Sequence, residues 1–124
     1  MALGHHCDDV VETTMMNMFY SGTLKTMTPI VPSTTGKLAL IRPMVYIKED
    51  SIIDYTKKNG ILAMNCGCTI EAGKTSSKRR ETKELLVALE EKTPGIKQSI
   101  FNSMNNINLD YVFGYTRGNK NDEK

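Results

Sequence analysis

The 124-residue sequence predicts an α/β protein with part of a doubly wound parallel sheet, followed by a C-terminal helical hairpin. Two short apolar runs, at 38–41 and 61–64, are bounded by glycine, proline or polar residues, as is typical of strands buried on both faces. Between them, residues 49–58 begin with two acids and end with two lysines before Gly60, which is the charge order and C-cap of a helix. This succession predicts a right-handed crossover unit with functional loops at the C-terminal ends of its strands.

The chain opens on an apolar stub, Met1-Ala2-Leu3, which runs into Gly4 without a turn or a cap. We therefore expect the stub to be the end of a buried strand. A chain that starts inside a strand is expected to be the second half of a larger fold, through truncation, gene splitting or a misplaced start, rather than a naturally short protein.

Residues 4–13 place two histidines, two aspartates and a glutamate at the N-terminal end of a predicted amphipathic helix. Asp9 and Glu12 have the spacing of a capping box, so we expect Asp9 to cap the helix. His6 and Asp8 would then lie just ahead of the exposed N-terminus, a position that favours phosphate. The core face is predicted from helical spacing to consist of Val10, Val11, Met15, Met18 and Phe19.

The remaining segments predict a loop, two helices and a tail. Residues 27–36 contain two prolines and a polar cluster, which indicates a loop. One helix is expected to begin at Ser76 or Ser77, and the next to have Thr93 as N-cap and Pro94 as its first residue. Their predicted buried stripes are Leu85, Leu86 and Leu89, then Ile96, Ile100, Met104 and Ile107. We assign 1–70 to the α/β domain, 71–115 to a helical extension and 116–124 to a disordered tail.

Charge and cysteine content restrict the function only loosely. The net charge of +2 does not identify a nucleic-acid binder. A local basic stretch either forms a solvated helix face or binds nucleic acid; it consists of Lys74, Lys78, Arg79, Arg80 and Lys83. Three cysteines and no apolar run long enough to span a bilayer indicate a reducing cytoplasm. Cys66 and Cys68 alone supply at most two metal ligands.

Several motifs occur together in an order that is typical of one enzyme family. They are Gly4-His5-His6 with Asp8-Asp9 and Glu12-Thr13, then Asn17-Met18-Phe19-Tyr20-Ser21-Gly22, Lys25-Thr26-Met27 before a proline-containing turn, Ile41-Arg42-Pro43 and Asn65-Cys66-Gly67-Cys68. Over residues 1 to about 115 the chain resembles the tRNA 2-thiocytidine biosynthesis proteins, which are PP-loop ATPases. The resemblance implies a nucleotide-hydrolase-like (HUP-like) α/β fold. It also implies a C-terminal portion of such a protein, because the family's Ser-Gly-Gly-x-Asp-Ser phosphate loop and its Cys-x-x-Cys pair are absent from these residues.

The resemblance further implies ATP-dependent thiolation of cytidine in tRNA, in which the base is adenylated and sulfur then displaces AMP. The implied cofactors of the complete enzyme are ATP, magnesium and a 4Fe–4S cluster. The implied partners are tRNA, a sulfur donor such as a cysteine desulfurase, and a missing N-terminal half or a homodimer partner, with no membrane. Because the phosphate loop is absent, we expect the chain alone to be inactive. The alternative is a non-catalytic remnant or a partner-binding module that needs a separate N-terminal half.

The first motif supplies the catalytic candidates. Asp8 and Asp9 are expected to bind magnesium or face the substrate, with Asp8 as the magnesium ligand. A purely capping role is the alternative, and it is favoured for Asp9. Given the resemblance, we expect His6 to contact phosphate or relay a proton, with His5 as its packing partner.

Arg42 follows a predicted strand and is fixed by Pro43, so its planar guanidinium is expected to bind phosphate or to form a salt bridge with Asp8 or Asp9. The candidates for contact with ATP phosphates or tRNA are therefore Arg42, His5, Lys78, Arg79 and Arg80. The family's cluster is implied to rest on three cysteines, one of them from the last motif. Cys68 is the first choice for this iron ligand and Cys66 the second.

Overall fold

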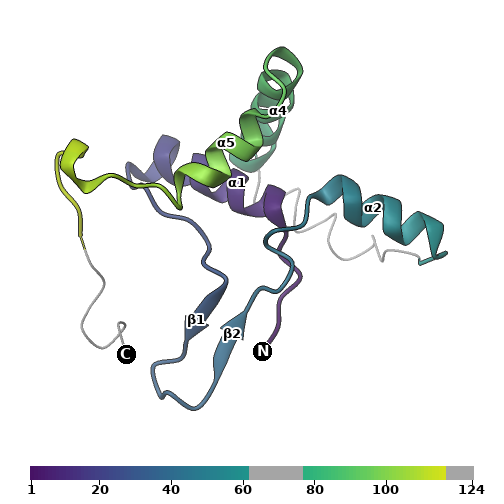
Figure 1. Cartoon of the computed structure of the whole chain (residues 1–124), viewed down its shortest axis with the longest axis horizontal. Coiled ribbons are helices and arrows are strands. Elements are labelled where there is room, and N and C mark those ends of the chain that lie inside the picture. Colours follow the sequence, from purple (N-terminus) through teal and green to yellow (C-terminus); the bar gives the residue numbers. More distant parts are fainter. Residues whose placement is uncertain (62–76, 117–124) are drawn as a thin grey trace.

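The computed structural model describes residues 1–61 and 77–116, and the chain is α/β, as predicted (Figure 1). In chain order, the described elements are helix α1 (Cys7–Met16), a π-helical turn (Asn17–Ser21), strands β1 (Ile30–Pro32) and β2 (Ala39–Ile41), helices α2 (Glu49–Lys58), α4 (Ser77–Lys92) and α5 (Ile96–Ser103), and a short 3₁₀ helix (Leu109–Tyr111). Within these residues, no helix combines the length and apolar character needed to cross a bilayer.

Strands β1 and β2 form an antiparallel hairpin in which Val31 pairs with Leu40. The prediction of a loop over 27–36 was therefore wrong for its middle part. The two prolines indicated a loop, but they do not exclude a strand here. A strand at the edge of a sheet tolerates proline, because proline lacks only a backbone donor. Strand β2 is also less buried than predicted, and Leu38 just before it is 73% exposed.

The N-terminal stub pairs with the other side of β2. Ala2 and Ile41 form a parallel bridge, in which the Leu3 amide donates to the Ile41 carbonyl at 2.9 Å and the Ile41 amide donates to the Met1 carbonyl at 2.8 Å. Met1 and Ala2 are nevertheless exposed, so the described residues do not bury this stub as predicted. The second predicted strand, 61–64, lies outside the described residues except for Ile61, and the described part shows no doubly wound parallel sheet.

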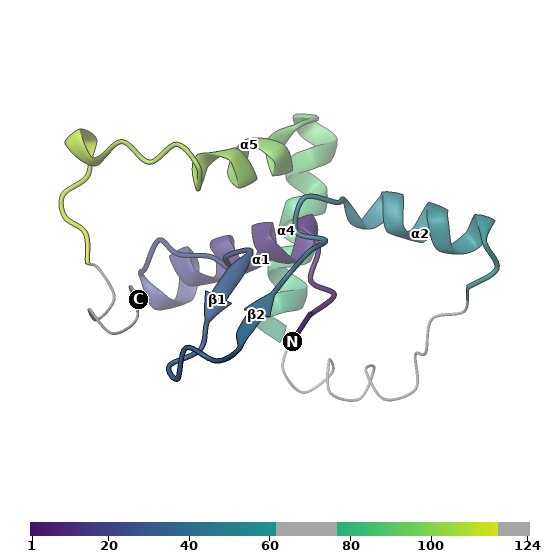
Figure 2. The same cartoon turned by 60° about the horizontal axis from the view of Figure 1, so that its bottom comes forward.

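Helix α2 has the predicted bounds and the predicted end. Gly60 has a φ of +65°, its amide donates to the Lys57 carbonyl, and the Ile61 amide donates to the Thr56 carbonyl, which together form a Schellman motif. None of its residues is buried, and it points away from the other elements in both views (Figures 1 and 2). The described residues therefore do not show the packing of a crossover helix against a sheet.

The core lies where the α4–α5 hairpin packs against α1 (Figure 2). Its buried side chains are Cys7, Val10, Val11, Met15, Val45, Leu86 and Phe101. Met18 and Phe19, which were predicted to share the core face of α1, are exposed because the helix passes into the π-helical turn after Met16. On α4, Leu86 is buried as predicted, but Leu85 is 41% exposed and Thr82 takes the core position one turn earlier.

Helices α1 and α5 begin at other residues than predicted. The N-cap of α1 is His6, so Asp9 is the third residue of the helix rather than its cap. The N-cap of α5 is Gly95, at a φ of +94°, so Thr93 and Pro94 lie in the connection to α4. The carboxylate of Glu90 accepts from the amides of Gly95 and Lys97 at 2.9 and 3.0 Å, and this side chain from α4 caps α5. Local sequence did not reveal this cap because it comes from the preceding helix.

Candidate functional site

The start of α1 carries three carboxylates close together, on Asp8, Asp9 and Glu12. Asp9 Oδ2 accepts from the His6 amide at 2.9 Å, so Asp9 does help to close the helix start. The same oxygen lies 3.4 Å from His6 Nε2. The contacts of Asp9 therefore agree with a capping role, which Asp9 performs from the third position of the helix.

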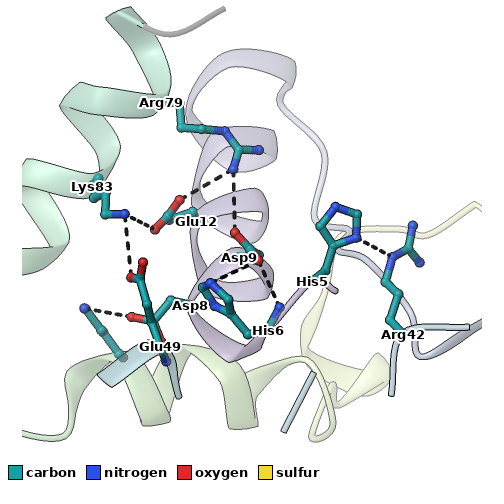
Figure 3. A network of polar contacts seen from close by, with 10 residues as sticks. His5, His6, Asp8, Asp9, Glu12, Arg42, Glu49, Arg79 and Lys83 are labelled. Atoms are coloured by element: carbon teal, nitrogen blue, oxygen red, sulfur yellow. Dashed lines mark hydrogen bonds and ion pairs between the residues drawn. The ribbon is translucent and has the colours of Figure 1, made fainter. Parts of the chain in front are cut away.

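Helix α4 directs two cations toward this acidic end, as the close-up shows (Figure 3). Arg79 Nη1 lies 3.6 Å from Glu12 Oε1 and 4.0 Å from Asp9 Oδ1. Lys83 Nζ lies 4.0 Å from Glu12 Oε2 and 3.6 Å from Glu49 Oε2. Part of the basic stretch thus forms ion pairs with α1, and its side chains remain 41% exposed at Arg79 and 52% exposed at Lys83.

Glu12 is a buried carboxylate, with 5% of its surface exposed. Burial raises its pKa above the ordinary value, and the neighbouring Asp9 and Glu49 act in the same direction. Lys83 and Arg79 oppose this rise but do not cancel it. Ionisation of Glu12 in the folded protein therefore costs free energy, and the two cations of α4 limit that cost.

Asp8 joins three elements through its two carboxylate oxygens. Oδ1 accepts from the Glu49 amide at 3.0 Å, at the start of α2, and Oδ2 accepts from Lys97 Nζ at 3.2 Å, from α5. Burial alone would raise the pKa of Asp8, yet the pKa is lowered because these two donors outweigh desolvation. A small cavity of about 110 Å³ lies beside the pair, lined in part by Cys7, Lys48 and Asp50.

His5 and Arg42 form a second polar pair, at the end of β2 (Figure 3). Arg42 Nε donates to His5 Nδ1 at 3.2 Å, and Arg42 Nη1 donates to the Thr28 carbonyl at 2.7 Å. Arg42 thus follows a strand as predicted, but the alternative of a salt bridge to Asp8 or Asp9 is not borne out in the described structure. The contact of His5 is with Arg42, and the buried Nδ1 of His6 has no hydrogen-bond partner among the described residues.

The other predicted site residues lie apart from this cluster or outside the described residues. Lys78 Nζ lies over the ring of Tyr20, 5.0 Å from its centroid, and Arg80 is exposed. Lys74, Cys66 and Cys68 belong to the residues that the structure does not describe. In residues 1–61 and 77–116, no three or more His, Cys, Asp or Glu side chains are grouped as a metal site requires. Burial raises the pKa of the Cys7 thiol, which disfavours its metal-binding thiolate form.

Sequence reasoning missed two residues of the cluster, Lys97 and Glu49. The sequence predicts only a favourable helix charge for Glu49, at the start of α2, and indicates no site role for Lys97. One local signal was available for Lys97. A lysine in the first turn of a helix opposes the helix dipole, and a residue that breaks a local rule often does so because of a tertiary contact.

No protein-family model matches the chain. Among curated proteins, the tRNA-cytidine(32) 2-sulfurtransferase of Geobacter sulfurreducens is 38% identical over 112 residues, which are 90% of this chain and 43% of that protein. The protein of the same name from Geobacter metallireducens is 40% identical over 107 residues, 86% of this chain and 41% of the relative. The one from Citrifermentans bemidjiense is 37% identical over 119 residues, 94% of this chain and 46% of the relative.

The chain therefore spans less than half the length of the curated relatives it matches. That proportion agrees with the predicted portion of a longer family member. The resemblance carried by the motifs is confirmed, and the chain is a relative of the tRNA-cytidine(32) 2-sulfurtransferases.

Proposed function

We propose that this chain is part of an ATP-dependent enzyme that thiolates cytidine in tRNA. The observation that carries the proposal is the identity of 37% to 40% with tRNA-cytidine(32) 2-sulfurtransferases over most of the chain. In the proposed reaction the cytidine O2 attacks the α-phosphate of ATP and releases pyrophosphate. Sulfide then forms a bond to C2, and AMP leaves with the former O2.

Arg42 is assigned to phosphate binding, with His5 orienting it. The bonds to His5 and to the Thr28 carbonyl fix the plane of the guanidinium at the end of β2, where functional loops lie in α/β proteins. A fixed guanidinium loses less conformational entropy when it binds a phosphate in a bidentate manner. Lys78, Arg79 and Arg80 are the further candidates for tRNA or phosphate, and of these Lys78 and Arg80 are exposed.

His6 and Asp8 are assigned to the reacting centre, while Asp9 holds the helix start in place. The carboxylate of Asp8 suits magnesium in its chemistry, because magnesium prefers one or two protein carboxylates together with phosphate oxygens. Each of its oxygens accepts one hydrogen bond, from Lys97 or from the Glu49 amide, and retains a second lone pair that is available to a magnesium ion. His6 is the imidazole that we expect to relay a proton or to contact phosphate, because it stands at the N-cap of α1, where a helix start favours an anion.

The iron–sulfur cluster is assigned to Cys68, with Cys66 as the second choice, and both lie outside the described residues. A cluster held by three thiolates leaves one iron open for sulfide. Cys7 does not fit as a ligand, because it is a buried thiol in the core of α1.

In the longer protein, β2 and the N-terminal stub are proposed to belong to a doubly wound parallel sheet. The parallel bridge between Ala2 and Ile41 supports this assignment. The proposed partners are an N-terminal portion or a second copy, a sulfur donor such as a cysteine desulfurase, and a cytoplasmic tRNA.

A partner-binding module without activity of its own is the second candidate. The observation that favours it is the exposure of large apolar side chains around α2, namely Tyr46, Ile53 and Tyr55. Such a surface suits another polypeptide better than solvent.

The test compares tRNA from the organism that carries this gene with tRNA from a deletion strain. Mass spectrometry of nucleosides should find 2-thiocytidine in the parent and not in the deletion strain. The wild-type gene should restore the nucleoside, whereas a gene with Asp8→Asn should not, although both proteins accumulate to the same level. Equal 2-thiocytidine in the parent and the deletion strain would overturn the proposed function, and restoration by Asp8→Asn would favour the partner-binding module.

A further inference from the structure

Lys97 occupies a position that local helix physics disfavours. It is the second residue of α5, and its first-turn neighbours are Ile96, Gln98 and Ser99, none of which is acidic. A cation near a helix N-terminus is disfavoured, because the helix dipole places partial positive charge there. A lysine at this position therefore indicates a compensating contact elsewhere in the fold.

The compensating contact is the hydrogen bond from Lys97 Nζ to Asp8 Oδ2, 3.2 Å long and partly buried. The backbone of Lys97 is itself held, because its amide donates to Glu90 Oε2. The side chain therefore leaves α5 from a fixed point and crosses to α1. This path connects residues that are far apart in the sequence.

Asp8 is held on its other side as well, by the Glu49 amide at 3.0 Å. Two donors from two different elements thus fix both carboxylate oxygens, which selects one side-chain rotamer. The cavity of about 110 Å³ that adjoins the pair leaves space for a small group next to the carboxylate. A carboxylate that is rigid and adjoins an open space has the features of a prepared site.

We propose that Lys97 is a positioning residue for Asp8 in the thiolation reaction. The inference rests on the function proposed above. On this basis the hairpin of α4 and α5 completes the reacting centre, since Lys97 of α5 and Glu90 of α4 together determine where the Asp8 carboxylate lies. Lys97 acts through Asp8 and does not itself touch the reacting atoms.

The experiment uses the natural full-length gene product, assayed for 2-thiocytidine formation with tRNA, ATP and a sulfide source. Lys97→Met should lower kcat about ten- to a hundred-fold and change KM little, because the lost interaction acts on the orientation of a reacting group. Lys97→Arg retains the charge but not the geometry of the donor, and its kcat should lie between those of Lys97→Met and wild type. Lys92→Met, at the exposed end of α4, is the matched control and should behave as wild type.

Thermal unfolding of each variant separates positioning from simple support of the fold. A Lys97→Met protein that melts earlier but retains the wild-type kcat overturns the proposal. If Lys97→Met does not fold, Lys97→Arg decides: a several-fold loss of kcat at unchanged KM supports the proposal, and a wild-type kcat overturns it. A wild-type protein that forms no 2-thiocytidine, in a strain whose tRNA lacks the nucleoside, instead overturns the proposed function and the inference with it.

Discussion

Arg79 Nη1 lies 3.6 Å from Oε1 of Glu12, a carboxylate that is almost fully buried between α1 and α4. The pair joins the helix that carries the first motif to the hairpin that follows much later in the chain. Because burial raises the pKa of Glu12 despite two nearby cations, the charge of this residue is only partly compensated. Substitution of Arg79 and substitution of Glu12 should therefore have measurable and opposite effects on stability.

Arg79→Ala should destabilise the fold by about 2 kcal/mol, below the range for fully buried pairs, because Arg79 is partly exposed and Lys83 remains near Glu12. Urea unfolding at neutral pH measures the difference in free energy. Arg80→Ala, on the exposed face of α4, is the control and should change stability by less than about 0.5 kcal/mol. In a Glu12→Gln background the Arg79→Ala change should cost much less, and an undiminished cost there would show that Arg79 acts through other contacts.

Glu12→Gln should become more favourable relative to wild type as the pH rises. The folded pKa of Glu12 is raised above the ordinary value of 4.5, so the wild-type fold favours the protonated acid. Its stability therefore falls as the pH rises from that value through the folded pKa, and the amide variant escapes this loss. Urea unfolding of both proteins at a series of pH values tests the trend. A stability difference that is constant with pH would contradict the cause assigned to the raised pKa.

Much of the fold follows from local patterns in the sequence. Helix α2 has its predicted bounds because its charges and Gly60 act within the helix and its cap. The antiparallel hairpin was not predicted, since two prolines outweighed the strand signal of Ile30 and Val31, and strand pairing is not a local property. The start of α5 was misplaced for a similar reason, because its capping carboxylate belongs to Glu90 of the preceding helix.

Leu86→Ala should destabilise the protein by about 2 to 5 kcal/mol, whereas Leu85→Ala should cost well under about 1 kcal/mol. The sequence placed both on one buried stripe, but Leu86 is 1% exposed in the core and Leu85 is not part of it. Truncation of Leu86 therefore leaves a cavity between α4 and α1, and truncation of Leu85 does not. Chemical denaturation of the two variants compares their losses of stability directly. Equal losses would indicate that Leu85 is buried together with Leu86, as the sequence predicts.

The acidic residues of the candidate site were proposed from the sequence, but their contacts were not. The sequence singled out His5, His6, Asp8, Asp9 and Arg42, and the structure does bring the acidic residues together at one helix start. The sequence could not show that Arg42 bonds to His5, because these residues meet only through the bridge between the N-terminal stub and β2. Nor could it identify Lys97, whose partner lies at the other end of the chain.

Glu90→Gln should lower the thermal unfolding midpoint at neutral pH and have little effect in acid. The amides of Lys97 and Gly95, which donate to the Glu90 carboxylate, hold its pKa below the ordinary value of 4.5. A carboxylate with a lowered folded pKa contributes stability above its unfolded pKa, and this contribution is lost as the pH falls through the folded value. The neutral amide that replaces the carboxylate in the variant accepts the same bonds more weakly at every pH, so the two proteins should converge below that window. Glu91→Gln, the adjacent exposed acid on α4, is the matched control and should show no such convergence. A midpoint for Glu90→Gln that equals wild type at neutral pH would mean that α5 does not need this cap.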